Sequence, residues 1–128
     1  HYLATYGTPK TPKELQDHTC IIDTNRRDAN KWLFHQPNHE HVHIPNRKLM
    51  VNSARIAKDW AKNGSGIALI PSFVLQGEIN DGTLVPVLNE FGLATHLLCA
   101  VYLTGHVMPK KVRALIDFAV SEFESMAG

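Results

Sequence analysis

The amino-acid sequence predicts a mixed α/β fold, and two stretches carry that prediction. Residues 67–70 form an apolar run without a polar break, with Gly64 and Gly66 before it and Pro71 after it. Glycine with positive φ ends helices, and proline interrupts the hydrogen-bonded ladder of a strand, so this pattern indicates a helix, a buried strand and a second short helix. Residues 109–125 begin with proline and place apolar side chains on one helical stripe. Helices that alternate with apolar strands are typical of an α/β sheet, whose sites lie beyond the strand ends.

The first half of the chain predicts short helices followed by strands. A helix is expected at residues 2–6, before a second one in which Thr11 is the N-cap and Pro12 the first helical residue. Glu14 is expected to act as the capping-box partner of Thr11, and this helix to end near residue 18. Apolar or alternating segments then predict strands at residues 19–23, 31–35, 40–44 and 48–51, with a polar loop at 24–30.

The second half predicts one clear helix after Ser53, ended by Asn63 and Gly64. Its expected buried face consists of Ile56, Ala57, Trp60 and Ala61. Further elements are expected at residues 73–75 (a single helical turn), 83–88 (an edge strand containing Pro86), 96–103 (a strand) and 109–125 (a closing helix).

The composition is that of one globular domain. The chain has 128 residues, 44% of them hydrophobic and 20% charged, and a formal net charge of +1, which does not favour nucleic-acid binding by this chain itself. No apolar run reaches the roughly 18 residues of a membrane span, and no signal peptide opens the chain, so a cytoplasmic location is expected. Cys20 and Cys99 both lie in apolar runs and are expected to be buried free thiols. Because the chain begins at His1, we expect it to be part of a longer protein.

The sequence offers little support for catalysis or for a cofactor. His39, His41 and His43 would share one face of a strand and are candidate zinc or copper ligands, but a histidine-rich surface explains them equally simply. No Gly-x-Ser-x-Gly motif is present. The glycines at 64 and 66 precede a strand, whereas a phosphate loop would follow one. We therefore expect no enzyme activity and no cofactor.

Three polar segments follow predicted strands and suggest a binding site. They contain Thr24, Asn25 and Arg26, then Asn52 and Ser53, and finally Pro71 and Ser72. The last two segments precede predicted helices, where free N–H groups and the helix dipole favour an anion, and Arg26 or Arg27 would add a charged fork. Each segment is equally compatible with an ordinary cap or loop.

Four segments, taken in order, resemble the effector-binding region of LysR-type transcriptional regulators. They are HYLATYGTPKTPKELQDHTCI, then W-x-F, then VNSARIAKDWAKNGSGIALIPSFVLQGEINDGTLVPVL, and then AVYLTGHVMPKKVRALIDF. The resemblance covers essentially the whole chain and rests on the order and spacing of these motifs. It implies a type II periplasmic-binding-protein-like fold, in which two α/β subdomains enclose an effector cleft.

The resemblance also implies a domain organisation. Residues 1–96 would form the second effector subdomain, and residues 97–128 the returning crossover strand and closing helix of the first subdomain, whose remainder is absent. DNA binding would belong to an N-terminal winged helix-turn-helix that this chain lacks. The family implies dimerisation through the C-terminal region and a small effector. Its contacts would fall at the same seven residues: Thr24, Asn25, Arg26, Asn52, Ser53, Pro71 and Ser72. The two predicted helix N-termini and Arg26 favour a carboxylate as that effector. The peroxide-sensing cysteine pair of one branch is not carried over, because Cys20 and Cys99 lie in predicted strands.

Two other functions stay open at this point. A fragment of a transporter's solute-binding protein would share the fold but would be exported. A metal-binding or enzymatic domain would instead centre on His39, His41 and His43. The upstream reading frame discriminates between them, because a helix-turn-helix of about 60 residues there would identify a regulator.

Overall fold

The computed structural model describes residues 1–34, 41–43, 48–92 and 108–127. The chain divides into two compact units, His1–Ala94 and Thr95–Gly128. The assignment of residues 1–96 and 97–128 to two effector subdomains stays a prediction.

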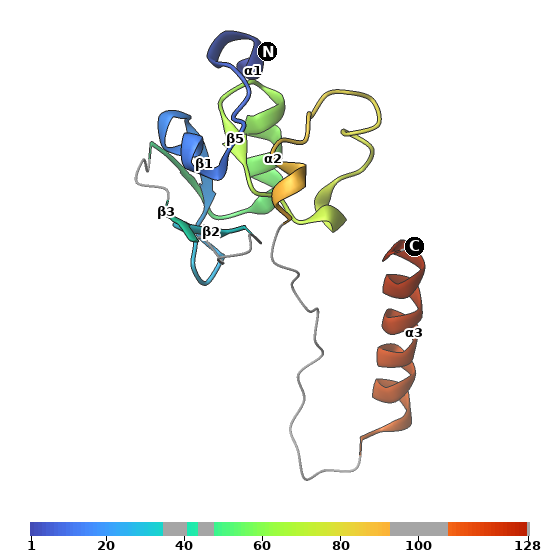
Figure 1. Cartoon of the computed structure of the whole chain (residues 1–128). Helices are drawn as coiled ribbons and strands as arrows, with labels where there is room; N and C mark the ends of the chain where they lie inside the picture. Colours follow the sequence, from blue (N-terminus) through green and yellow to red (C-terminus); the bar gives the residue numbers. More distant parts are fainter. Residues whose placement is uncertain (35–40, 44–47, 93–107, 128) are drawn as a thin grey trace. The chain divides into compact units, whose positions relative to one another are not determined.

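The first unit is built on a parallel sheet with the strand order β4-β1-β5 (Figure 1). Its strands are β1 (Cys20–Asp23), β4 (Leu49–Val51) and β5 (Ile67–Ala68). Ile21 pairs with Leu49 on one side and with Ala68 on the other. The strands predicted at residues 19–23 and 48–51 are therefore confirmed, and the central strand is buried along its whole length.

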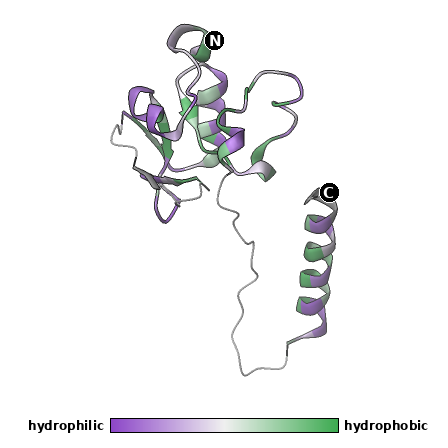
Figure 2. Ribbon diagram, in the orientation of Figure 1, coloured by the Kyte–Doolittle hydropathy of each residue, from purple (hydrophilic) through white to green (hydrophobic). Residues whose placement is uncertain are grey.

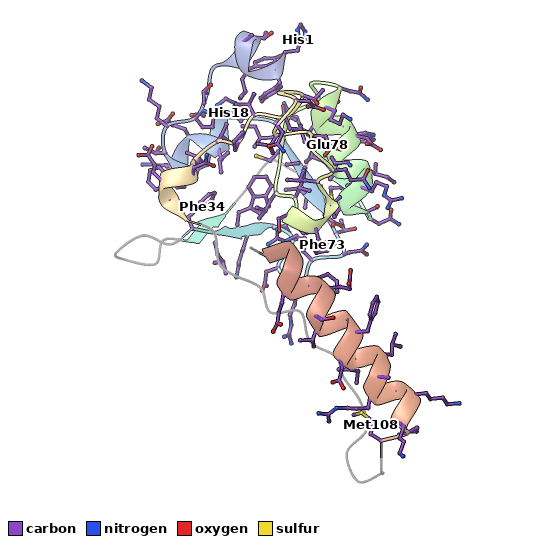
Figure 3. The ribbon with its side chains drawn as sticks, turned by 90° about the vertical axis from the view of Figure 1, so that its right-hand side faces the viewer. His1, His18, Phe34, Phe73, Glu78 and Met108 are labelled. Carbon is purple, nitrogen blue, oxygen red and sulfur yellow. The ribbon has the colours of Figure 1, made fainter. Side chains whose placement is uncertain are left out.

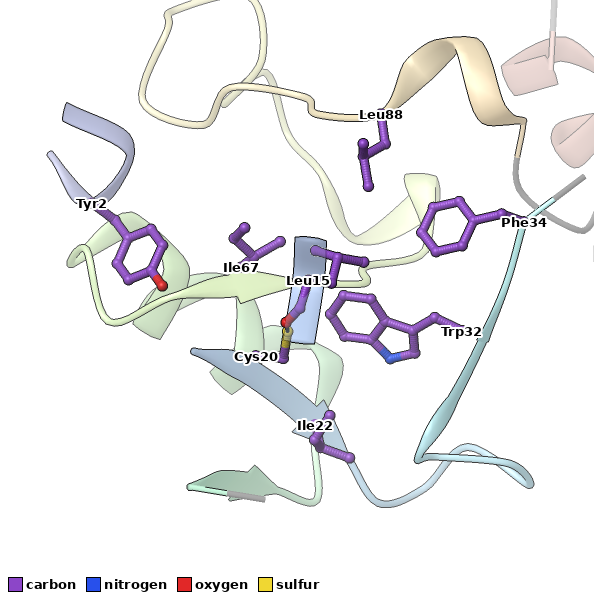
Figure 4. Close-up of a cluster of buried hydrophobic side chains, with 8 residues drawn as sticks. All are labelled: Tyr2, Leu15, Cys20, Ile22, Trp32, Phe34, Ile67 and Leu88. Carbon is purple, nitrogen blue, oxygen red and sulfur yellow. Dashed lines mark hydrogen bonds between the residues drawn. The ribbon is translucent and has the colours of Figure 1, made fainter. Parts of the chain in front are cut away.

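Apolar side chains lie on both faces of this sheet. Of the buried strand predicted at residues 67–70, only Ile67–Ala68 forms a strand, and residues 68–70 are half-buried. One cluster joins Cys20, Ile22 and Ile67 to Leu15 and Trp32, with Tyr2, Phe34 and Leu88 completing it (Figure 4). The other cluster joins Ile21 and Val51 to Ala57 of helix α2 (Ala54–Lys62). Successive residues of a strand point to opposite faces, so β1 supplies both clusters by simple alternation.

The N-terminal helices lie where the sequence predicts them. Helix α1 (Tyr2–Tyr6) is attached to the sheet by the Tyr2 hydroxyl, which accepts a hydrogen bond of 2.8 Å from the Thr19 N–H. The next element, η1 (Pro12–Asp17), is a 3-10 helix with Pro12 at its first position. Glu14 accepts hydrogen bonds from the Thr11 hydroxyl and the Lys10 N–H, both at 2.9 Å. Its carboxylate thus closes the start of the helix, although Thr11 makes no capping bond of its own.

The predicted buried face of α2 is right for Ala57 and Ala61 and wrong for Ile56 and Trp60. Ala57 and Lys58 are buried, and Ala54 and Ala61 are half-buried, whereas Ile56 is 41% and Trp60 36% exposed. Alanines allow close approach of the helix to the sheet, and Lys58 is buried because Glu78 neutralises its charge. The larger apolar side chains consequently lie outside the packed face.

The remaining elements of the first unit are short. An antiparallel pair of strands is formed by β2 (Lys31–Leu33) and β3 (His41–His43), and single 3-10 turns by η2 (Ser72–Val74) and η3 (Asn89–Phe91). The edge strand predicted at residues 83–88 is wrong, since this segment contains no strand and its Leu84 N–H donates to the Glu78 carbonyl at 2.8 Å. Among the predicted strand residues, His35, Glu40, Ile44 and the run 96–103 lie outside the described residues.

The second unit contains helix α3 (Lys110–Ala127), which begins directly after Pro109 as predicted. The Val112 and Arg113 N–H groups both donate to the Pro109 carbonyl, at 2.9 and 3.1 Å. Apolar residues recur along the helix between polar ones (Figure 2). In the parts of the chain that the structure describes, no helix is both long and apolar enough to cross a membrane.

Gly66 lies at a position next to the sheet where a larger residue would clash with the backbone. A Cβ built on it would lie 2.4 Å from the Thr19 carbonyl oxygen, which also accepts the Ile67 N–H at 2.9 Å. Contacts this short do not occur in proteins, so the close approach of the backbone at residue 66 to Thr19 requires a residue without a side chain.

We expect Gly66→Ala to lower the free energy of unfolding by about 2–4 kcal/mol, because the Thr19 carbonyl must move and weaken the link between β1 and β5. Gly82→Ala is the matched control. Gly82 also has a positive φ, but a Cβ added to it would have no other atom within 4 Å, so we expect a loss of about 1 kcal/mol. Urea unfolding of the two variants measures the difference, and equal losses would contradict this role of Gly66.

Candidate functional site

Two of the three polar segments predicted as a binding site, those after β1 and β4, are hydrogen-bonded to each other at one edge of the parallel sheet. Among the described residues, no hydrogen bond joins Pro71 or Ser72 to them. The Thr24 N–H and hydroxyl both donate to the Val51 carbonyl, at 2.7 and 3.0 Å. The Asn25 side-chain amide donates to the Asn52 carbonyl. Because carboxyl ends of parallel strands share an edge, the turn after β1 is bonded directly to the loop after β4.

Arg26 is held at the base of this turn. Its N–H donates to the Asp23 carbonyl at 3.3 Å, and its side chain is half-buried. Burial lowers the pKa of the guanidinium, and the nearby Asp23 carboxylate opposes that shift. Asp23 itself is buried and accepts the Asn25 N–H at 3.0 Å. The positive charge expected from Arg26 is therefore partly balanced by a carboxylate of the same turn.

Ser53 precedes α2 with an extended backbone, as predicted for an N-cap. Its carbonyl accepts the Ala57 N–H at 3.0 Å, but its hydroxyl makes no capping hydrogen bond. No acidic residue lies in the first turn of the helix. The N–H groups at the start of α2 thus lack a side-chain acceptor, which leaves them available to an anion.

The structure corrects the interpretation of Pro71 and Ser72. Pro71 is the N-cap residue, and Ser72 is the first residue of η2. The Pro71 carbonyl accepts the Val74 N–H at 3.0 Å. A three-residue 3-10 turn has no aligned dipole comparable to that of an α-helix, so α2 alone supplies the helix N-terminus predicted to favour an anion.

A cavity of about 420 Å³ lies beside the start of α2. Its lining consists of Ser53, Ala54, Arg55, Lys58, Phe73, Val74 and Gln76. Of the seven predicted residues only Ser53 lines it. Phe73 belongs to η2 and is 70% exposed, an unusual state for a phenylalanine (Figure 3). An aromatic side chain two residues after Pro71, in a segment that follows a predicted strand, was the available signal in the sequence.

A buried ion pair supports one wall of this cavity. Lys58 Nζ lies 2.6 Å from Glu78 Oε1 and donates to the Val74 carbonyl at 3.1 Å. The hydrogen bond from Lys58, together with the Gln76 N–H, lowers the pKa of Glu78 to about 2. Through these bonds one lysine fixes both η2 and the following loop against α2.

A second cavity, of about 280 Å³, has a mostly apolar lining. It includes the core residues Trp32 and Phe34, the residues Leu69 and Ile70 that follow β5, and the segment 83–87. Most of its lining residues are apolar, so it offers few groups that would orient a ligand.

The other chemical candidates gain no support from the described residues. His41 and His43 lie in β3, and His39 lies outside the described part of the chain. The residues that are described contain no group of three or more His, Cys, Asp or Glu side chains placed to hold a metal ion. Cys20 is a buried free thiol whose pKa burial raises to about 12, so it stays protonated and unreactive. Cys99 lies outside the described residues.

Comparison with known proteins agrees with this architecture. The family model for the LysR substrate binding domain matches residues 1–124, so the chain belongs to the LysR substrate-binding domain family.

Among the similar proteins are regulators of known structure. The transcriptional regulator CrgA of Neisseria meningitidis is 30% identical over 122 residues, which are 94% of this chain and 40% of that protein. The CrgA regulatory domain has a TM-score of 0.78 at 28% identity and matches 94% of this chain and 59% of that one. Full-length AphB, a virulence activator of Vibrio cholerae, has a TM-score of 0.59 at 26% identity over 68% of this chain and 30% of its own. The chain thus spans less than half of the full-length relatives that it matches.

The Lys58–Glu78 pair predicts a specific pH dependence of stability. Because the pKa of Glu78 is lowered in the folded state, its contribution is present above the unfolded-state pKa and is lost as pH falls through the folded value of about 2. We expect Glu78→Gln to destabilise the chain clearly at pH 6 and much less near pH 2. Urea unfolding across this range measures the difference, with the exposed Glu90→Gln as control. A Glu78→Gln penalty that is the same at both pH values would contradict the pairing.

Proposed function

We propose that this chain is the effector-sensing part of a longer LysR-type transcriptional regulator. The family match over residues 1–124 supports this function, as does the likeness to the CrgA regulatory domain. DNA binding would belong to an N-terminal winged helix-turn-helix outside this chain. The chain itself would bind a small molecule and transmit that event to the rest of the regulator, without catalysis and in the cytoplasm.

The effector is an anion, most plausibly a carboxylate, bound at the sheet edge. The observation that carries this proposal is the hydrogen-bonded junction of Thr24 and Asn25 with the loop before α2, next to a helix start that has no side-chain cap. Asn52 and Ser53 offer polar groups at that start, and the segment after β5 contributes Pro71 and Ser72. Arg26 adds positive charge at the base of the turn, although Asp23 balances part of it.

The predicted ligand class is open to a direct test in the full-length protein that contains this region. Organic acids should bind at least about tenfold more tightly than amines of equal size, because free N–H groups and cations favour negative charge. Ser53→Ala should weaken acid binding about fivefold while leaving stability nearly unchanged, since the hydroxyl makes no capping bond.

Isothermal titration calorimetry measures both effects, and Ser121→Ala on α3 is the matched control. A preference for amines or neutral sugars would contradict an anionic effector. If Ser53→Ala leaves the affinity for organic acids unchanged, Ser53 is not part of the site.

We also propose that the chain forms a dimer through α3. This helix has an apolar stripe of Val112, Leu115, Ile116, Ala119, Val120 and Phe123, and the side chains of Val112, Leu115, Val120 and Phe123 are exposed. Burial of a side chain of this size stabilises by about 1.5–3 kcal/mol, so an apolar stripe of this length is typical of an interface.

Substitutions of two phenylalanines on α3 distinguish a specific interface from nonspecific hydrophobic association. Phe123 lies on the stripe and is 45% exposed, whereas Phe118 lies off it and is 62% exposed. Sedimentation velocity at micromolar concentration should show a dimer that Phe123→Glu shifts toward monomer and Phe118→Glu does not. Truncation after residue 105 should also give a monomer. This interface would be refuted if the unsubstituted chain is a monomer, or if the two substitutions have equal effects on the dimer.

A further inference from the structure

The cavity between α2 and η2 has the volume of a small-molecule site and a lining that contains polar side chains and an aromatic ring. Its volume of about 420 Å³ falls within the range of ligand pockets. Both walls belong to the first unit, and the buried Lys58–Glu78 pair holds them together. The shape of this cavity is therefore a property of the chain by itself.

The charge in the lining is positive and comes from one side chain. Lys58 is already neutralised by Glu78 at 2.6 Å, whereas Arg55 is exposed and takes part in no ion pair among the described residues. No acidic side chain is found among the residues that line the cavity. A guanidinium in this setting favours a carboxylate, with which it forms paired, charge-assisted hydrogen bonds.

The second recognition element is the ring of Phe73. It lines the same cavity and is 70% exposed, so its ring has no packing partner over most of its surface. Aromatic side chains prefer other planar rings, in offset-stacked or edge-to-face contact. Ser53 and Gln76 add hydrogen-bonding groups to the same lining.

We propose that this cavity binds an aromatic carboxylate, whose carboxylate pairs with Arg55 and whose ring packs on Phe73. The inference rests on the proposed effector-sensing function and extends it by naming the ligand class and two residues that determine specificity. Neither Arg55 nor Phe73 belongs to the sheet-edge segments predicted from the sequence.

Three probes of similar size separate the two contacts on the full 128-residue chain. Benzoate carries both a ring and a charge, cyclohexanecarboxylate has the charge without an aromatic ring, and benzamide has the ring without the charge. Titrations followed by ¹H–¹⁵N correlation spectra should shift the amides of residues 53–55 and 72–76 with benzoate. Its affinity should exceed that of either other probe by about threefold to tenfold.

Substitutions assign the contacts to residues. Arg55→Gln should weaken benzoate about fivefold and leave benzamide unchanged, and Phe73→Leu should remove the preference for benzoate over cyclohexanecarboxylate. Arg113→Gln and Phe118→Leu on α3 are the matched controls for charge and ring. Well-dispersed spectra of each variant establish that it is folded.

The inference is overturned if benzoate gives no saturable shift up to its solubility limit, if the shifted amides lie elsewhere, or if Arg55→Gln leaves its affinity unchanged. A full-length regulator that responds only to a non-aromatic acid would also overturn it while the proposed sensing function stands. Loss of response to every organic acid would instead contradict the proposed function itself.

Discussion

The position of β1 between two parallel neighbours is the constraint on which the first unit depends. All four of its residues are buried, it pairs with β4 and β5, and its alternating side chains fill the cores on both faces. Parallel pairing places the carboxyl ends of all three strands at one edge, so the turn at Thr24 must meet the loop at Asn52. The geometry of the candidate site thus follows from the strand pairing, which depends in turn on the close approach of Gly66 to Thr19.

Local signals in the sequence were sufficient for most of the elements. A proline after a capping residue located η1, and short apolar runs located β1 and β4, because such signals act within a few residues. The buried face of α2 was not predictable in this way. It contains Lys58, whose burial depends on Glu78 in a later loop of the chain, and hydrophobic periodicity alone favours Ile56 and Trp60 instead. The strand expected at residues 83–88 failed for a related reason, since an apolar segment becomes a strand only where a neighbouring strand is available to pair with it.

In the candidate site too, some residues were predictable from local sequence signals and others depend on packing between distant elements. Polar residues directly after strands are recognisable in a sequence, because the fold class alone determines where strand ends lie, and Thr24, Asn25 and Asn52 do lie together. Arg55 and Phe73 share a cavity only because η2 packs against α2, and that contact depends on the bond from Lys58 to the Val74 carbonyl. Packing between elements of this kind leaves no short-range pattern from which the cavity could have been predicted.

The cations near the site illustrate why charge in a sequence does not translate directly into charge available to a ligand. Lys58 is paired with Glu78, so its charge is already engaged within the fold, whereas Arg26 is half-buried and the Asp23 carboxylate balances its charge only in part. Arg55, one turn before Lys58 on the same helix, is exposed and has no acidic partner among the described residues. Since a partner already in place weakens the attraction of a cation for a second anion, the charge of Arg55 is available to an effector in full and that of Arg26 only in part.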